Sequence, residues 1–107
     1  MCIIIIMNQF LIQSKTLLSG QEAPFIGQPQ NIARFRDAGF TVYSSGQGSV
    51  SLQYKSPIFE NDWVDFYKFG GLTTGYAEPA YLTTPLTEVR AISSGNGRFW
   101  CAFIAQN

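Results

Sequence analysis

The chain has 107 residues, in which seven Lys and Arg balance seven Asp and Glu, and it has no histidine. This length corresponds to one domain, and zero net charge argues against a non-specific nucleic-acid binder, which needs a basic surface. Histidine is the commonest general base near neutral pH and the commonest metal ligand. Its absence therefore argues against an enzyme, and we expect no catalytic residue, no metal site and no cofactor.

Charged residues make up 13% and aromatic residues 15% of the chain. An average soluble domain has about 25% charged residues. The shortage of charge beside an excess of aromatic residues favours a binding or structural module, in which much of the surface contacts other proteins.

The chain opens with an apolar segment. Four consecutive isoleucines stand in it: Ile3, Ile4, Ile5 and Ile6. A signal peptide has basic residues before its apolar segment, and none precedes these isoleucines. The segment is also shorter than the roughly 20 residues of a membrane helix. Since β-branched residues favour strands, we expect an extended arm over residues 1–20, which includes Phe10, and a β-sandwich domain over residues 21–107. A neighbouring subunit is the expected partner of this arm.

The two cysteines, Cys2 and Cys101, lie near opposite ends of the chain. We expect both to be reduced and buried, which suits assembly in a reducing host cytoplasm. A disulfide between them stays open as an alternative, because the sequence does not give its geometry.

The first third of the chain gives weak strand signals. A strand is predicted over residues 9–14, and the segment that contains it is predicted to stop at the polar Ser19 and Gly20. Residues 20–31 are predicted to form a loop, since prolines and a glycine recur in it. Residues 31–36 are a weak strand candidate.

The middle of the chain is clearer. A strand is predicted over residues 40–44, and the strict alternation of apolar and polar residues over 49–55 predicts a second one. A loop follows, with Ile58 and Phe59 at its tip. Residues 63–69 are predicted to form a strand with aromatic residues on both faces.

The last third begins with residues 72–85, where a short strand near Tyr76 or near Tyr81 and Leu82 is predicted. Two strands over residues 86–93 and 98–105 flank a glycine-containing turn. In the final strand Trp100 faces away from Phe99, and a strand that is apolar on both faces is expected to be covered on both.

Six to eight short strands without a helical pattern predict an all-β protein, built as a single-domain antiparallel β-sandwich or barrel-like fold with an extended N-terminal segment. The glycine pairs have neither the spacing nor the following helix of a phosphate-binding loop, so we interpret them as hairpin turns.

Two stretches carry a resemblance to a known group of proteins. Residues 48–57 run from a glycine through an alternating strand to Ser-Pro, and residues 62–66 continue as Asp-Trp-Val-Asp-Phe. Residues 89–103 hold Val-Arg-Ala-Ile-Ser-Ser-Gly and then the last strand. This pattern resembles small all-β accessory proteins of tailed-phage virions, which decorate capsid heads, form head fibres or belong to tails. The sequence departs from it at Ile58 and Phe59, where an apolar loop tip replaces Asp-Gly.

The resemblance implies a non-enzymatic virion protein, most of all a head decoration protein, with the major capsid protein or tail proteins and copies of itself as partners. It implies no nucleic-acid or membrane partner. The residues expected at its interfaces are Ile3, Ile4, Ile5, Ile6, Phe10, Ile58, Phe59, Trp63, Tyr67 and Trp100.

Two alternatives remain open. The protein could belong to a tail, neck or baseplate instead of a head. It could also be a carbohydrate-binding β-sandwich module, in which Trp63 and Tyr67 share one strand face near Asn61 and Asp65.

Overall fold

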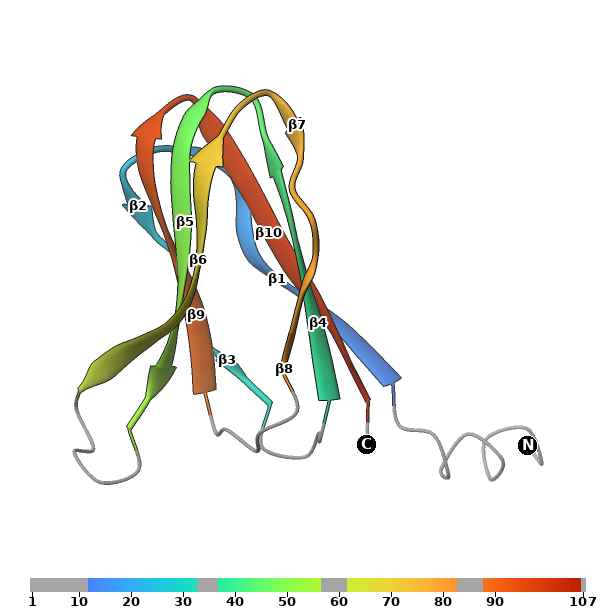
Figure 1. Cartoon of the computed structure of the whole chain (residues 1–107). Coiled ribbons are helices and arrows are strands. Elements are labelled where there is room, and N and C mark those ends of the chain that lie inside the picture. Colours follow the sequence, from blue (N-terminus) through green and yellow to red (C-terminus); the bar gives the residue numbers. More distant parts are fainter. Residues whose placement is uncertain (1–11, 33–36, 57–61, 83–87, 107) are drawn as a thin grey trace.

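A computed structural model describes residues 12–32, 37–56, 62–82 and 88–106. These residues form ten strands, arranged as two antiparallel sheets packed face to face (Figure 1). The prediction of an all-β antiparallel sandwich is thereby confirmed. Within these residues, no helix has the length and apolar character to cross a membrane.

The first sheet is called the β10 sheet here. Its strands are β1 (Ile12–Glu22), β10 (Arg98–Gln106), β4 (Asp37–Ser44), β7 (Gly75–Tyr76) and β8 (Ala80–Leu82). β10 lies between β1 and β4, while β7 and β8 pair with opposite ends of the far edge of β4.

The second sheet is called the β9 sheet. Its strands are β2 (Phe25–Ile26), β3 (Gln30–Asn31), β9 (Glu88–Asn96), β5 (Gln47–Lys55) and β6 (Trp63–Leu72). β9 pairs with β5 on one side and with the short β2 and β3 on the other, and β6 forms the opposite edge.

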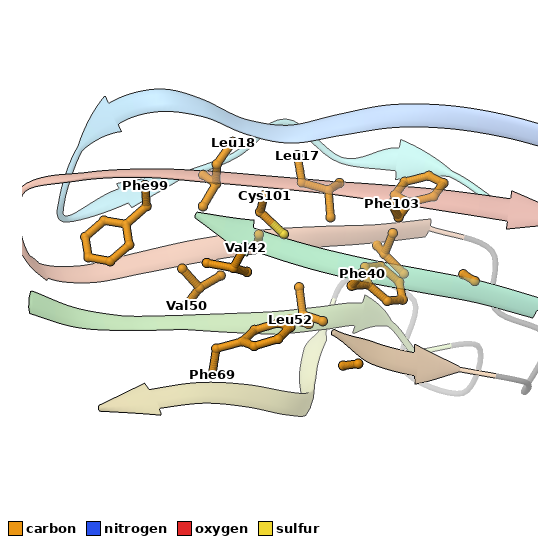
Figure 2. Close-up of a cluster of buried hydrophobic side chains, with 14 of the residues drawn as sticks. Leu17, Leu18, Phe40, Val42, Val50, Leu52, Phe69, Phe99, Cys101 and Phe103 are labelled. Carbon is orange, nitrogen blue, oxygen red and sulfur yellow. The ribbon is translucent and has the colours of Figure 1, made fainter. Parts of the chain in front are cut away.

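The core lies between the two sheets (Figure 2). Alternate residues of β10 are buried, as the period of two in a strand requires. The largest fully buried apolar side chains are Phe40, Phe99, Phe103, Leu18, Leu52, Val42, Val50 and Val89. They come from both sheets, so each sheet presents its second face to the outside.

The predicted polar end of the first strand at Ser19 and Gly20 is wrong. β1 continues to Glu22, with two irregularities in its pairing to β10, between Thr16 and Leu18 and between Ser19 and Gln21. A bulge accommodates an extra residue without ending a strand. β1 therefore runs across the expected boundary between residues 20 and 21.

The predicted loop over residues 20–31 contains two short strands instead. Phe25 pairs with Ser93, Gln30 pairs with Val89, and between them Gly27 N donates to the Ala91 oxygen at 2.8 Å. The prolines interrupt this edge without removing it, since a proline is tolerated at sheet edges. Both short strands considered near Tyr76 and Tyr81 exist, as β7 and β8.

Candidate interaction surface

The outer face of the β9 sheet carries a network of charged and polar side chains, with Ile26 paired to Ile92 at one edge. Arg90 Nε donates to Gln53 Oε1 at 2.8 Å, and Gln53 Nε2 donates to Asp65 Oδ1 at 2.7 Å. The guanidinium of Arg90 also lies 4.3 Å from the centre of the Trp63 ring. This network satisfies its polar groups within one sheet, as expected of a face in contact with water.

The outer face of the β10 sheet has the opposite character, and we call it the aromatic face. Its aromatic and apolar residues are Tyr43, Tyr76, Tyr81, Trp100, Ala102 and Ile104, and the polar Ser14, Thr16, Ser19, Thr41 and Gln106 share the face with them. Among the described residues of these strands, outward charges occur only at the two ends of the face. Asp37 lies at one end. Arg98 and Glu22 lie at the other end, with Arg98 Nη2 3.5 Å from Glu22 Oε1.

Three rings form the centre of one half of the aromatic face. The ring centroid of Tyr43 lies 5.4 Å from that of Trp100 and 4.8 Å from that of Tyr76, with interplanar angles of 60° and 61°. Such edge-to-face contacts are favourable for aromatic pairs. Trp100 is 37% exposed and Tyr76 is 84% exposed, so the group is ordered by mutual contact and still open to a partner.

Trp100 is held in place by Gly20 on the neighbouring strand. A Cβ atom at Gly20 would lie 2.8 Å from the indole ring, and the φ angle of this residue is +88°. Only glycine adopts this backbone conformation without cost and also leaves room for the indole. The bulge in β1 thus leaves room for the indole ring of Trp100.

Two shallow hollows lie along the aromatic face, and Thr41 lines both. One has a volume of about 380 Å³ and is bordered by Tyr43, Tyr76 and Trp100. The other has a volume of about 450 Å³ and is bordered by Tyr81 and Ile104. The face therefore has relief, with a depression on each side of its middle.

Of the ten residues predicted at interfaces, three lie in the described part of the chain. Trp100 is on the aromatic face, while Trp63 and Tyr67 belong to β6 of the other sheet. The remaining seven lie outside the described residues: Ile3, Ile4, Ile5, Ile6, Phe10, Ile58 and Phe59.

The prediction that Trp63 and Tyr67 share one strand face is wrong. Asp65 pairs with Gln53 and Tyr67 pairs with Leu52, so that Phe66 is an extra residue in β6. This bulge reverses the alternation. Trp63 lies under Arg90 on the outer face, whereas Tyr67 is on the side of buried Leu52 and contacts Phe69, with ring centroids 4.9 Å apart.

The residues predicted at interfaces do not include four others of the aromatic face: Tyr43, Tyr76, Tyr81 and Ile104. A signal for Ile104 was present, because it follows Trp100 by four residues in a strand of strict alternation. The two exposed tyrosines of β7 and β8 had no comparable pattern, since strands of two and three residues are too short to show one.

The described residues offer little catalytic chemistry. No group of three or more His, Cys, Asp or Glu side chains gathers among them in a way that suits a metal ion. Cys101 is a free thiol in the core, and burial raises its pKa from 9.0 to about 12. A thiol in this environment is a poor nucleophile, because the reactive species is the thiolate.

The sequence matches no protein-family model, and a comparison with curated proteins finds no relative. Among solved structures, the chain is similar to YomS from the SPBc2 prophage, with a TM-score of 0.72 and 14% identity over 92% of this chain and 95% of that one. It is also similar to the exported protein XepA of PBSX, with a TM-score of 0.55 and 13% identity over 89% of this chain and 37% of that one.

A third similar structure is a chain of Bacillus endospore appendages, which form a family of disulfide-linked pili. Its TM-score is 0.53, with 12% identity over 91% of this chain and 88% of that one. At these identities the likeness establishes a shared sandwich fold. Because one fold hosts many functions, the function has to be argued from the surface.

Proposed function

We propose that the chain is a non-enzymatic structural subunit of a phage or phage-derived particle, and within that class a head decoration protein. The observation that carries this proposal is the contrast between the two outer faces. One sheet presents a charged network, while the other presents rings and apolar side chains with charges only at its ends. A monomer with no partner has no reason to keep such a face open to water.

The composition of the aromatic face is that of a protein interface. Interface cores are enriched in tyrosine, tryptophan and phenylalanine and depleted of charge. Tryptophan and tyrosine also dominate the few positions that carry most of the binding energy. Trp100 and Tyr43 fit this role because contacts with Gly20 and Tyr76 already fix their rings before any partner binds.

The similar folds support a structural role in a particle. Two of the similar structures come from prophages, and the third comes from a pilus-like appendage. The resemblance of the strands around Trp63 and Trp100 to accessory proteins of tailed-phage virions favours the head, with the major capsid protein as the partner. A location in a tail, neck or baseplate is the alternative within the same class.

The carbohydrate-binding alternative has weaker support. Sugar rings stack on flat aromatic platforms, whereas Tyr43, Tyr76 and Trp100 meet at angles near 60°. The pair expected to form the platform, Trp63 and Tyr67, is divided between two sides of β6. In addition, the guanidinium of Arg90 already covers a face of Trp63.

The test is to purify the particles made by the genome that encodes the chain, and to examine them by mass spectrometry and by immuno-electron microscopy. We expect a copy number of the same order as that of a major particle protein, with antibody on the head. Label on the tail would support the alternative location. Absence of the chain from gradient-purified particles would contradict the proposal.

A further inference from the structure

We propose that the occupant of the aromatic face is a second copy of this chain, packed face to face about a two-fold axis that crosses the strands near Thr41. The inference rests on the proposed structural role and names the partner of the same surface. It follows from the shape, the charges and the size of the face, which are taken in turn below.

The shape of the face is complementary to itself. A hollow lies on each side of Thr41, and a side chain projects at each end. Tyr76, at 84% exposure, stands at one end, while Tyr81 at 78% and Ile104 at 59% stand at the other. A two-fold axis across the strands brings opposite ends together, so Tyr76 of each copy enters the hollow beside Tyr81 and Ile104 of the other. Every contact is then made twice, as in an isologous dimer.

The charges of the face suit the same arrangement. The strand residues in the middle of the face carry no charge, while the exposed Glu78 lies at its edge, on the connection between β7 and β8. The two-fold axis places the Asp37 end of one copy against the Arg98 end of the other. Arg98 is exposed and donates to the Gly20 oxygen and to Glu22, which leaves some of the five guanidinium N–H groups for a second carboxylate.

The size of the face matches one interface. It is four strands wide, and its central strand β10 has nine residues. With strands about 4.8 Å apart and a rise of about 3.4 Å per residue, the flat area is roughly 590 Å², to which the relief of the side chains adds. A standard interface buries about 800 Å² on each partner. One copy therefore covers the face, and the charged β9 sheets become the outer layers of the dimer.

The experiment compares two isoleucines on opposite faces. Ile104 lies on the aromatic face and is 59% exposed, while Ile26 pairs with Ile92 in the β9 sheet and is 56% exposed. The full chain and its Ile104→Lys and Ile26→Lys variants are measured by sedimentation velocity over a range of concentrations. Circular dichroism checks that each variant is folded.

We expect the wild type and Ile26→Lys to be dimers with the same dissociation constant. Ile104→Lys should raise the dissociation constant at least about 100-fold, because dimerisation would remove a charged lysine from water in place of an apolar side chain. Tyr76→Ser, at a side chain that is almost fully exposed, should weaken the dimer without loss of fold. A wild type that stays monomeric, or an Ile104→Lys variant that associates like the wild type, would overturn the inference.

Two further measurements separate this inference from the proposed function. A variant that lacks residues 1–7 should still dimerise, and loss of the dimer in that variant alone would assign the contact to the N-terminal segment. If Ile104→Lys fails to enter particles while its own association is unchanged, the face contacts another virion protein, and only the inference is wrong. If the chain neither dimerises nor enters particles, both are wrong.

Discussion

The indole of Trp100 occupies its position because Gly20 has no side chain. The indole lies against the backbone of Gly20, which has a φ angle of +88° at a bulge in β1. The ring then contacts Tyr43, which contacts Tyr76. A single glycine thus determines the arrangement of three aromatic side chains on the candidate interface.

Gly20→Ala should therefore disturb both stability and association. A left-handed backbone costs a non-glycine residue about 1–2 kcal/mol, and the new methyl group would also displace the indole. In a Trp63→Phe background, we expect the tryptophan emission to shift to longer wavelength and the free energy of unfolding in urea to fall. Gly70→Ala is the control, since a Cβ there meets nothing within 4 Å. Equal effects of the two changes would argue against this role of Gly20.

Cys101 provides a second prediction, in which pH changes stability. The pKa of its thiol is raised from 9.0 to about 12 by burial. Between these values the unfolded chain loses the thiol proton while the folded chain keeps it, so stability falls as pH rises above 9. The slope is about 1.4 kcal/mol per pH unit.

The measurement is urea unfolding at several pH values above 9. Cys101→Ala should remove this part of the slope, whatever its effect on stability at neutral pH. In a Cys2→Ser background, the folded protein should also react with a thiol reagent far more slowly than the unfolded protein at pH 8. A fast reaction of the folded protein would contradict the burial of this thiol.

At the scale of elements, alternation predicted the long strands well. The pattern over residues 49–55 corresponds to β5, and that over residues 98–105 corresponds to β10. The bulge at Phe66 and the short strands β2 and β3 had no local signal, since each depends on pairing with a distant strand. The assignment of Trp63 and Tyr67 to one face failed for this reason.

The close approach of β5 and β9 gives a prediction at this scale. A Cβ at Gly48 would lie 2.0 Å from the backbone oxygen of Ser94, which belongs to the neighbouring strand β9. Because backbone on both sides has to move, Gly48→Ala should destabilise the fold by about 1–3 kcal/mol or more. Urea unfolding measures this change, again with Gly70→Ala as the control. A variant as stable as the wild type would show that the two strands separate easily.

At the scale of the whole molecule, the scarcity of charge predicted a surface for other proteins, and the structure shows which outer face carries aromatic and apolar side chains between its charged ends. Composition has no direction, so it could not distinguish the two outer faces. The distinction depends on which strands share a sheet: β4, β7, β8 and β10 bring together Tyr43, Tyr76, Tyr81 and Trp100, whereas β5, β6 and β9 bring together the hydrogen-bonded Gln53, Asp65 and Arg90. Of the residues predicted at interfaces, Trp100 is on the aromatic face, and those of the N-terminal segment stay predictions.

The central claim is that the aromatic face is an assembly surface, and incorporation into particles tests it most directly. Particles made without the chain would be incubated with purified wild type, Ile104→Lys or Ile26→Lys, then separated on a gradient and the bound chain quantified. We predict that Ile26→Lys binds like the wild type and that Ile104→Lys binds at least about tenfold less. The lysine disrupts either a direct contact of the aromatic face with the particle or the dimer, which attaches to the particle at two points. Equal incorporation of the two variants would contradict the claim.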